Sequence, residues 1–236
     1  MAPPPRQIAL LLMAMGGPDS LENVEPYLLD VRGGRPTSPE LVEEIRTRYR
    51  LTGGKSPVLE ITREVAVALE RRLNASGAAR VQCYVGLRHW HPFIKDAFAE
   101  LLKDGPDHIV GLCLAPQYSS LSIGAYVKKV EEARAELADE TPISFVTSWH
   151  RHPLLIAAIV GHIRQTLERF APEVRAQVPV LFTAHSLPER VVAMKDPYPE
   201  EVRGTVEAVG AQLGGQPTRF AYQSQGRSGE KWLGPS

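Results

Sequence analysis

The sequence is poor in cysteine and in aromatic residues, and its charges show no excess of either sign. Two of the 236 residues are cysteine, and Phe, Trp and Tyr together make up 7% of the chain. Cys83 and Cys113 lie inside apolar segments, so we interpret them as small core residues of a reduced, cytoplasmic protein. Lys plus Arg and Asp plus Glu each number 27. A nucleic-acid binder normally carries a basic excess, so this balance argues against a nucleic-acid partner.

Long hydrophobic runs are absent as well. The longest, Ile8 to Met15 and Leu154 to Val160, fall far short of the about 20 residues that span a bilayer. The N-terminus reads MAPPPRQ, which lacks the basic and then apolar pattern of a secretory signal. We therefore expect neither membrane insertion nor secretion. The remaining composition, 43% hydrophobic and 23% charged, is typical of a globular protein with a substantial core.

Apolar runs and helical periods alternate along the chain. Short apolar runs bounded by turn residues are typical of strands buried on both faces, as in a parallel sheet. These runs are Ile8 to Met15, Val81 to Val85, Ile109 to Ala115, Ile143 to Thr147, Val178 to Ala184 and Thr218 to Tyr222. The alternation predicts an α/β protein with a mainly parallel sheet, as one sheet or as two smaller ones. A candidate domain boundary lies near residue 150, where WHRHP interrupts the pattern. Functional sites in such sheets form at the carboxyl ends of the strands.

Helices are predicted between the strands. Ser56 and Pro57 are interpreted as an N-cap followed by proline at the first helical position, and Ser38 and Pro39 open another helix in the same way. The helix after Pro57 is expected to bury one apolar face, made of Val58, Ile61, Val65, Leu69 and Leu73. Further apolar stripes occur at residues 94–101, 123–137, 155–167 and 202–209.

Several common motifs fail on inspection. The stretch Gly53 to Ser56 resembles the tail of a phosphate-binding P-loop, but the glycine that the pattern needs earlier is Tyr49. There is no G-x-S-x-G sequence and no C-x-x-C pair, which argues against a serine-hydrolase elbow and a structural zinc site. The required cysteines for an iron–sulfur cluster are absent too.

One histidine stands out among seven. His185 follows the apolar run PVLFTA and precedes SLP, which places its imidazole at the carboxyl edge of a sheet. Two interpretations stay open, a metal or proton-transfer group and a structural histidine that bonds a loop carbonyl. His89 and His91 form an H-x-H pattern, but Pro92 opens the next helix and His91 is better explained as marking that corner.

Arginines and tyrosines supply the other candidates. Arg32 lies in VRGGRP, and Arg48 lies in IRTRYR. Such runs are usually solvated helix faces, and the alternative is a carboxylate clamp, because a guanidinium binds a carboxylate in bidentate fashion. Tyr49, Tyr118 and Tyr126 are either core residues or the lining of an apolar pocket.

Taken in order, several strings resemble the ferrochelatase family along essentially the whole chain. AHSLP, then DPYP, then a QS pair and finally WLGP form the most specific series. The matching strings are MAMGGPDSLENVEPYLLDVRGGR, RYRLTGGKSPV, YVGLRHWHPF, LAPQYSS, FTAHSLPERV, DPYPEEV and YQSQGRSGEKWLGP. The resemblance implies two similar Rossmann-like domains, at residues 1–150 and 151–236, with the second incomplete and a cleft between them. It also implies insertion of Fe²⁺ into a porphyrin at the end of haem synthesis.

The resemblance assigns roles to individual residues. His185 would be the catalytic and metal-site histidine. The porphyrin contacts would map onto Met15, Arg32, Arg48, Tyr49, Ser56 and Tyr126. Insertion needs removal of the pyrrole N–H protons and ligands for the metal in place of water. A neutral imidazole can accept a proton or bind Fe²⁺, because nitrogen suits borderline metals and a free imidazole has a pKa of about 6.5. Both roles stay open for His185.

Two departures from the family pattern bear on function. Met15 occupies a position that is typically a haem-ligating tyrosine in the coproporphyrin-using bacterial branch, so protoporphyrin IX and coproporphyrin III both remain candidate substrates. The chain stops at Ser236, whereas family members continue through another strand, an acidic segment and a last helix. That stretch carries the glutamate facing the metal-site histidine, so we expect a fragment, an incomplete gene model or a split gene, with low activity.

The competing hypotheses come from different classes. One is a non-catalytic porphyrin or haem binder, and another is a chelatase for a different tetrapyrrole and metal, such as cobalt. The expected partners are porphyrin and Fe²⁺, with no resident cofactor and no nucleic acid. An apolar cleft lip is a candidate for peripheral membrane contact. The sequence does not determine the oligomeric state.

Overall fold

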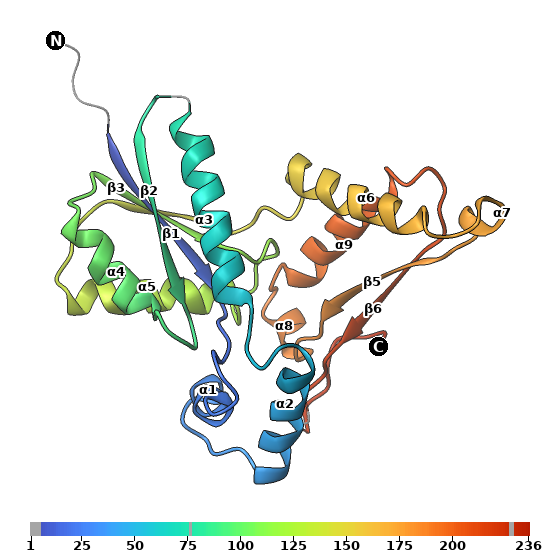
Figure 1. The fold of residues 1–236 in the computed structure, drawn as a ribbon, viewed down its shortest axis with the longest axis horizontal. Helices are drawn as coiled ribbons and strands as arrows, with labels where there is room; N and C mark the ends of the chain where they lie inside the picture. Colours follow the sequence, from blue (N-terminus) through green and yellow to red (C-terminus); the bar gives the residue numbers. More distant parts are fainter. Residues whose placement is uncertain (1–5, 76, 227–228) are drawn as a thin grey trace. The chain divides into compact units, whose positions relative to one another are not determined.

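The computed structural model describes residues 6–75, 77–226 and 229–236, and its elements follow the predicted alternation of strands and helices (Figure 1). Two compact units are present, Met1–Ala115 with Ser122–Thr147, and Pro116–Leu121 with Ser148–Ser236. The domains at 1–150 and 151–236, and the cleft between them, stay predictions. All six predicted strands are found and each pair of neighbouring strands is parallel, which confirms the α/β class.

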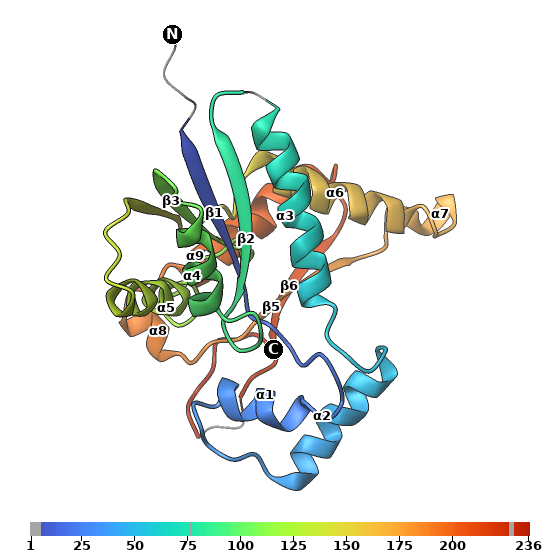
Figure 2. The same cartoon turned by 60° about the vertical axis from the view of Figure 1, so that its left-hand side comes forward.

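The first unit is built on a four-stranded parallel sheet in the order β2-β1-β3-β4. The strand β1 is almost entirely buried, because helices cover both faces of the sheet. The helix α3 (Val58–Asn74) lies on one face, and α4 (Ile94–Lys103) and α5 (Ile123–Glu136) lie on the other (Figure 2). The chain leaves β1 toward β2 and later returns to pair β3 on the other side of β1. The switch point therefore lies where β1 and β3 end, next to Met15. The strands are β1 Gln7–Ala14, β2 Arg80–Leu87, β3 His108–Cys113 and β4 Ile143–Val146.

The helix α3, Val58–Asn74, forms as predicted, but its predicted buried face is wrong in part. Ile61 and Leu73 are exposed, whereas Thr62 and Ala66 are buried. Each residue turns a helix by about 100°, and the orientation of α3 buries Thr62 and Ala66, one turn apart, while Ile61 and Leu73 face solvent. The small side chains of Thr62 and Ala66 allow close approach, and the Thr62 hydroxyl donates to the Val58 carbonyl (2.6 Å). Size and local hydrogen bonding outweigh hydrophobicity here.

The predicted N-cap is correct for one helix and wrong by one residue for another. Ser38 caps α2, Pro39–Leu51, and its hydroxyl accepts from the Leu41 N–H (3.4 Å). Ser56 was predicted as the cap of α3, but Pro57 occupies that position and Ser56 lies one residue earlier. The helix α1, Val24–Val31, was not predicted, because it is short and follows a polar turn. The remaining helices of this unit are α4 Ile94–Lys103 and α5 Ile123–Glu136.

The helices α1 and α2 pack on each other beyond the carboxyl ends of the strands. Their shared core contains Val24, Tyr27, Leu28 and Val42. The Tyr27 hydroxyl reaches back to donate to the Gly16 carbonyl (3.3 Å), just after β1. Burial raises the pKa of Tyr27 to about 12, so its hydroxyl keeps the proton that it donates. This layer is thereby fixed to the sheet edge where sites form.

The second unit contains a two-stranded parallel sheet of β5, Val180–His185, and β6, Thr218–Gln223. One face is covered by α6, Pro153–Leu167, and α9, Tyr198–Gly210, with Ile156, Val160 and Val209 packed on Phe182. Side chains alternate along a strand, so Leu181 and His185 point to the other face, where Leu181 is 61% exposed. The short helices are α7 Pro172–Arg175 and α8 Arg190–Ala193.

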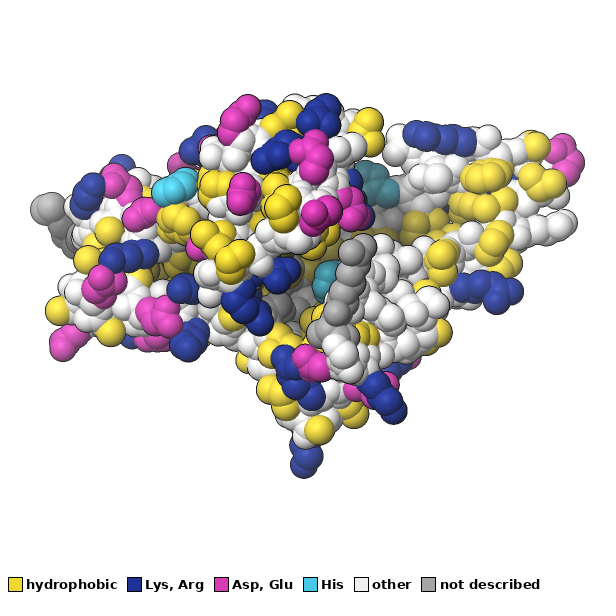
Figure 3. Space-filling view, turned by 90° about the horizontal axis from the view of Figure 1, so that it is seen from below, with side chains coloured by type: hydrophobic (Ala, Val, Ile, Leu, Met, Phe, Trp, Pro, Cys, Tyr) yellow, Lys and Arg dark blue, Asp and Glu magenta, His cyan; other side chains and the backbone are white. Residues whose placement is uncertain are grey.

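Two surface properties bear on partners. No helix in the described ranges combines the length and the apolar character needed to cross a membrane. On the face seen in Figure 3, basic and acidic side chains are interspersed, with apolar side chains between them. This arrangement matches the equal totals of basic and acidic residues.

Candidate functional site

A tight turn follows β1 at the switch point of the first sheet. Met15 is 49% exposed there, although Ala9 to Met13 of the same apolar run are buried. Gly16 has φ +89°, a conformation that disfavours side chains, and Gly17 packs directly on Ser56. A Cβ at Gly17 would lie 2.5 Å from the Ser56 Cβ and 3.5 Å from the Tyr49 hydroxyl. The turn thus brings together three of the predicted porphyrin contacts: Met15, Tyr49 and Ser56.

Ser56 and Tyr49 are held in place by backbone and core contacts. The Ser56 N–H donates to the Pro18 carbonyl (2.8 Å), and the Ser56 hydroxyl accepts from the Val58 N–H (3.4 Å). Tyr49 packs on the core shared by α1 and α2, and burial raises the pKa of its phenol. A neutral phenol therefore presents an aromatic face and a hydroxyl donor at this edge.

Gly17 gives a direct test of this packing. We expect Gly17→Ala to destabilise the protein by about 1–3 kcal/mol, because the added methyl must displace Ser56 or the turn. Gly161→Ala in α6 is the matched control. No atom lies within 4 Å of its new methyl, so alanine should stabilise the helix by about 0.5–1 kcal/mol. Urea unfolding of both variants measures the difference, and equal stabilities would contradict the close approach.

Tyr126 and Arg88 form a second part of the edge. Tyr126 is buried on α5, and its ring lies under the Arg88 guanidinium, 5.5 Å from ring centre to carbon. Burial raises the pKa of the Tyr126 phenol, so the ring stays neutral. Backbone hydrogen bonds join the Arg88 loop to the turn after β1. The Arg88 N–H donates to the Ala14 carbonyl (2.9 Å), and the His89 N–H donates to the Met15 carbonyl (3.0 Å). Sequence reasoning missed Arg88, although its place after β2 was a usable signal.

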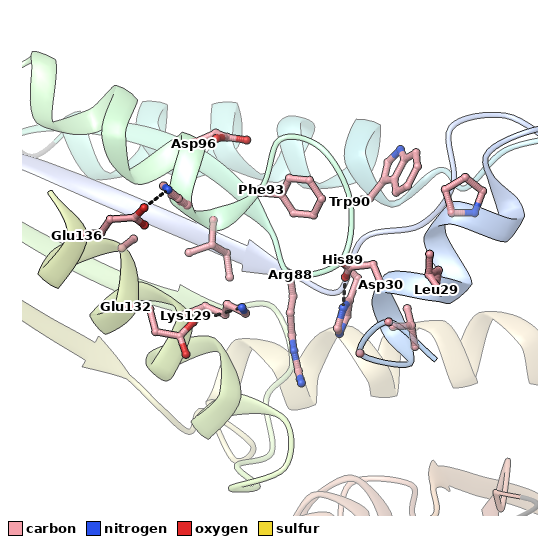
Figure 4. A pocket seen from close by; sticks show the side chains of 17 residues that line it. Leu29, Asp30, Arg88, His89, Trp90, Phe93, Asp96, Lys129, Glu132 and Glu136 are labelled. Carbon is pink, nitrogen blue, oxygen red and sulfur yellow. Dashed lines mark hydrogen bonds and ion pairs between the residues drawn. The ribbon is translucent and has the colours of Figure 1, made fainter. Parts of the chain in front are cut away.

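A pocket of about 890 Å³ adjoins Arg88 and His89 (Figure 4). Its walls combine apolar side chains such as Leu29, Trp90 and Phe93 with charged groups from α1, α4 and α5. Arg88 and His89 project from the same loop in the same direction. The pocket therefore offers an aromatic-lined concave surface that carries charges of both signs. The charged side chains of its lining are Arg88, Lys95, Lys129, Asp30, Asp96, Glu132 and Glu136.

The two histidines of the H-x-H pattern do not act together. The His89 Nδ1 lies 2.7 Å from the Asp30 carboxylate, which only accepts hydrogen bonds, so Nδ1 carries the proton. Burial lowers the pKa of His89, and the Asp30 bond opposes this only in part. His91 instead packs edge-on against Phe93, with ring centres 4.4 Å apart. Within the described ranges, no group of three or more His, Cys, Asp or Glu is placed to hold a metal ion.

The predicted arginines lie on helix surfaces. Arg48 is 71% exposed on its side chain and pairs with Glu44 one turn earlier (2.5 Å). Arg50 is exposed and pairs with Glu43 (3.3 Å), whereas Arg46 is 28% exposed, pairs with Glu43 (2.8 Å) and also donates to the Leu21 carbonyl (3.1 Å). The solvated-face interpretation therefore fits Arg48 and Arg50 better than Arg46. Arg32 follows the end of α1, and its carbonyl accepts from the Arg35 side chain (3.1 Å). Their porphyrin contacts stay predictions.

His185 belongs to the second unit, whereas the other six predicted residues belong to the first. It is the last residue of β5, pairs in register with Gln223 and is exposed. Its carbonyl accepts from the Tyr198 hydroxyl (2.8 Å), and the next N–H, of Ser186, donates to the Gln223 carbonyl (2.7 Å). The imidazole thus lies at a carboxyl strand edge on a fixed backbone, where it is open to ligands.

Comparison with known proteins points to one family. The ferrochelatase family model matches residues 7–236. A ferrochelatase of Herpetosiphon aurantiacus is 43% identical over 227 residues, covering 96% of this chain and 74% of that protein. A ferrochelatase of Deinococcus radiodurans is 39% identical over 98% of this chain and 73% of its own. A coproporphyrin III ferrochelatase of Listeria innocua is 35% identical over 98% of this chain and 74% of its own.

Proposed function

The chain belongs to the ferrochelatase family, enzymes that insert a metal ion into a porphyrin, and we propose that its own reaction is Fe²⁺ insertion at the end of haem biosynthesis. The observation that carries this proposal is the exposed His185 at the carboxyl end of β5, within a chain that matches the family along residues 7–236. The reaction needs no resident cofactor, because both the metal and the macrocycle are substrates.

His185 has the chemistry that the reaction requires. Metal insertion removes protons from the pyrrole nitrogens and strips water from Fe²⁺. An imidazole nitrogen can bind the metal or take a proton, and exposure leaves the ring free to do either. We assign His185 this role and leave the order of the two events to experiment.

The first unit supplies groups suited to the macrocycle. The Met15 thioether packs well against an aromatic ring, and Tyr49 and Tyr126 are neutral because burial raises the pKa of each phenol. Arg32, Arg48 and Arg88 are cations that would meet porphyrin carboxylates. Ser56 fixes the turn that presents Met15. Binding therefore combines apolar contact on the ring with charge at its periphery.

The two cysteines bear on the compartment in which the protein works. Both cysteines are free thiols, and burial raises the pKa of Cys83 to about 11 and that of Cys113 to about 12. Unreactive thiols of this kind fit a reducing compartment, and we propose the cytoplasm.

The substrate is either protoporphyrin IX or coproporphyrin III, the porphyrin in the name of the Listeria innocua relative. Coproporphyrin III carries more propionates and gains more from cationic side chains.

The test is an anaerobic insertion assay followed by absorbance, with Fe²⁺ and each porphyrin in turn. Turnover with Fe²⁺ supports the proposal, and the ratio of the two kcat/KM values identifies the substrate. Porphyrin binding without turnover would make the chain a non-catalytic binder. Turnover with Co²⁺ and not with Fe²⁺ would make it a chelatase for another metal.

Arg48 tests the peripheral charge. We expect Arg48→Ala to weaken binding of the free-acid porphyrin by about tenfold, the size of one charged hydrogen bond reduced by its competing pair with Glu44. The loss should be smaller for a porphyrin ester, whose propionates carry no charge. Arg50→Ala is the matched control, because Arg50 is an exposed, paired arginine on the same helix. Equal losses for acid and ester, or equal losses in both variants, would show that Arg48 is a solvated helix residue.

A further inference from the structure

The backbone on both sides of the His185 side chain is held by hydrogen bonds. The ladder between β5 and β6 ends at the His185–Gln223 pair, where a strand would normally begin to fray. The Ser186 N–H continues the pairing by donating to Gln223 (2.7 Å), and the Tyr198 hydroxyl donates to the His185 carbonyl (2.8 Å). The Tyr198 contact comes from a helix and spans 13 residues of sequence.

Tyr198 is itself firmly placed. Its N–H donates to the Asp196 carboxylate (3.1 Å) at the start of α9. Asp196 is 5% exposed and also accepts from the Ser119 hydroxyl (3.1 Å) and from the N–H and hydroxyl of Ser120 (both 2.7 Å). The Tyr198 ring packs on the core around Val191 and Tyr222. The backbone and the ring of Tyr198 are therefore both held in place, and they fix the position of its hydroxyl.

The direction of the hydrogen bond between Tyr198 and His185 follows from the two groups themselves. A carbonyl lacks a proton, so the hydroxyl must be the donor in this pair.

We propose that Tyr198 is a positioning residue, whose hydroxyl fixes the His185 peptide and thereby aims the imidazole at the metal. The inference rests on the proposed function of His185 as the metal-site histidine. A side chain moves with the peptide that carries it. A mobile peptide at the end of a strand would therefore let the imidazole of His185 adopt several orientations. Fixing the carbonyl leaves rotation about the side-chain bonds alone, and such small displacements of a reacting group matter greatly to rate.

The structure provides a matched control for this role. Tyr222 lies in the same core cluster as Tyr198 and is buried. Its hydroxyl is buried too, and it has no hydrogen-bond partner among the residues that the structure describes. Tyr198→Phe and Tyr222→Phe thus make the same chemical change in the same cluster, and only the first removes a bond to His185.

The experiment compares both variants with the parent chain by NMR of the histidine ring C–H signals. The His185 signal is identified by its loss in His185→Ala. We expect Tyr198→Phe to shift or broaden that signal and to lower kcat/KM for Fe²⁺ by about tenfold or more, with porphyrin affinity kept. Tyr222→Phe should leave both unchanged. Urea unfolding shows that each variant is folded.

The outcomes separate this inference from the function that it rests on. A His185 signal and kcat/KM unchanged in Tyr198→Phe would overturn the positioning role. Equal changes in Tyr198→Phe and Tyr222→Phe would also overturn it, because they would indicate general loosening of the cluster. Normal turnover in His185→Ala would instead remove His185 from the reaction, whatever the NMR signals show.

Discussion

Replacing His185 with alanine is expected to lower the rate of Fe²⁺ insertion by about 10²–10⁴-fold while porphyrin binding stays nearly unchanged. The reason is that different side chains would act on the metal and on the macrocycle. In the proposed function, metal ligation and proton removal need the imidazole, whereas porphyrin affinity would come from apolar contact and from cationic side chains of the first unit. An anaerobic insertion assay gives the rate, and quenching of protein fluorescence by porphyrin gives the affinity.

The control is His162→Ala. His162 is an exposed histidine of α6, and alanine is a better helix former, so this variant should fold and react as the parent does. Near-normal turnover in His185→Ala would contradict the assignment. A parallel loss of porphyrin binding in that variant would contradict the division between metal chemistry and macrocycle affinity.

The strands and the strand-edge positions of Met15 and His185 were predictable, because each depends on a local pattern. A run such as Ile8 to Met15 is continuous, apolar and followed by glycines, which few structures other than a buried strand accommodate. Met15 ends that run and His185 directly follows the run Val178 to Ala184, so their place at a carboxyl strand edge follows from the pattern. The resemblance to the ferrochelatase family then attached a chemistry to that edge.

Contacts between distant segments were not predictable from local pattern. The Arg88 guanidinium lies over the Tyr126 ring because β2 and β3, which precede Arg88 and α5, both pair with β1. Asp30 meets His89 across 59 residues, and Asp196 meets Ser119 across 77. The choice of the buried face of α3 failed for a related reason, since the sheet selects the small Ala66 over the larger Ile61. Packing between elements, not propensity within them, determines these outcomes.

Asp196 carries the second large effect, this time on stability. The carboxylate is buried and accepts from Ser119, Ser120 and Tyr198, so it ties the 116–121 segment to the start of α9. Asp196→Ala leaves those donors without an acceptor. We expect a loss of about 3 kcal/mol in the free energy of unfolding, since each buried donor left unsatisfied costs about 1–3 kcal/mol. Urea unfolding at neutral pH measures it.

The control for this loss is Glu200→Ala, in the first turn of α9, the helix that follows Asp196. Glu200 is exposed and pairs with Arg203 at the surface (2.8 Å), so its removal should cost less than about 0.5 kcal/mol. Equal costs for Asp196→Ala and Glu200→Ala would show that the buried carboxylate contributes no more than a surface charge.

The pH dependence of the Asp196 effect has a definite sign. Burial alone would raise the pKa of the Asp196 carboxyl, but the bonds from Ser120, Tyr198 and Ser119 outweigh burial and hold that pKa below its usual value. A carboxyl whose pKa is lower in the folded than in the unfolded chain stabilises the fold above the unfolded pKa, about 3.9, and loses that contribution as pH falls through the folded value. The difference between parent and Asp196→Ala should therefore be constant from about pH 5 to 8 and shrink below about pH 4. A difference that grows as the solution is acidified would mean that the carboxyl is protonated in the folded protein, and the network described for Ser119, Ser120 and Tyr198 would be wrong.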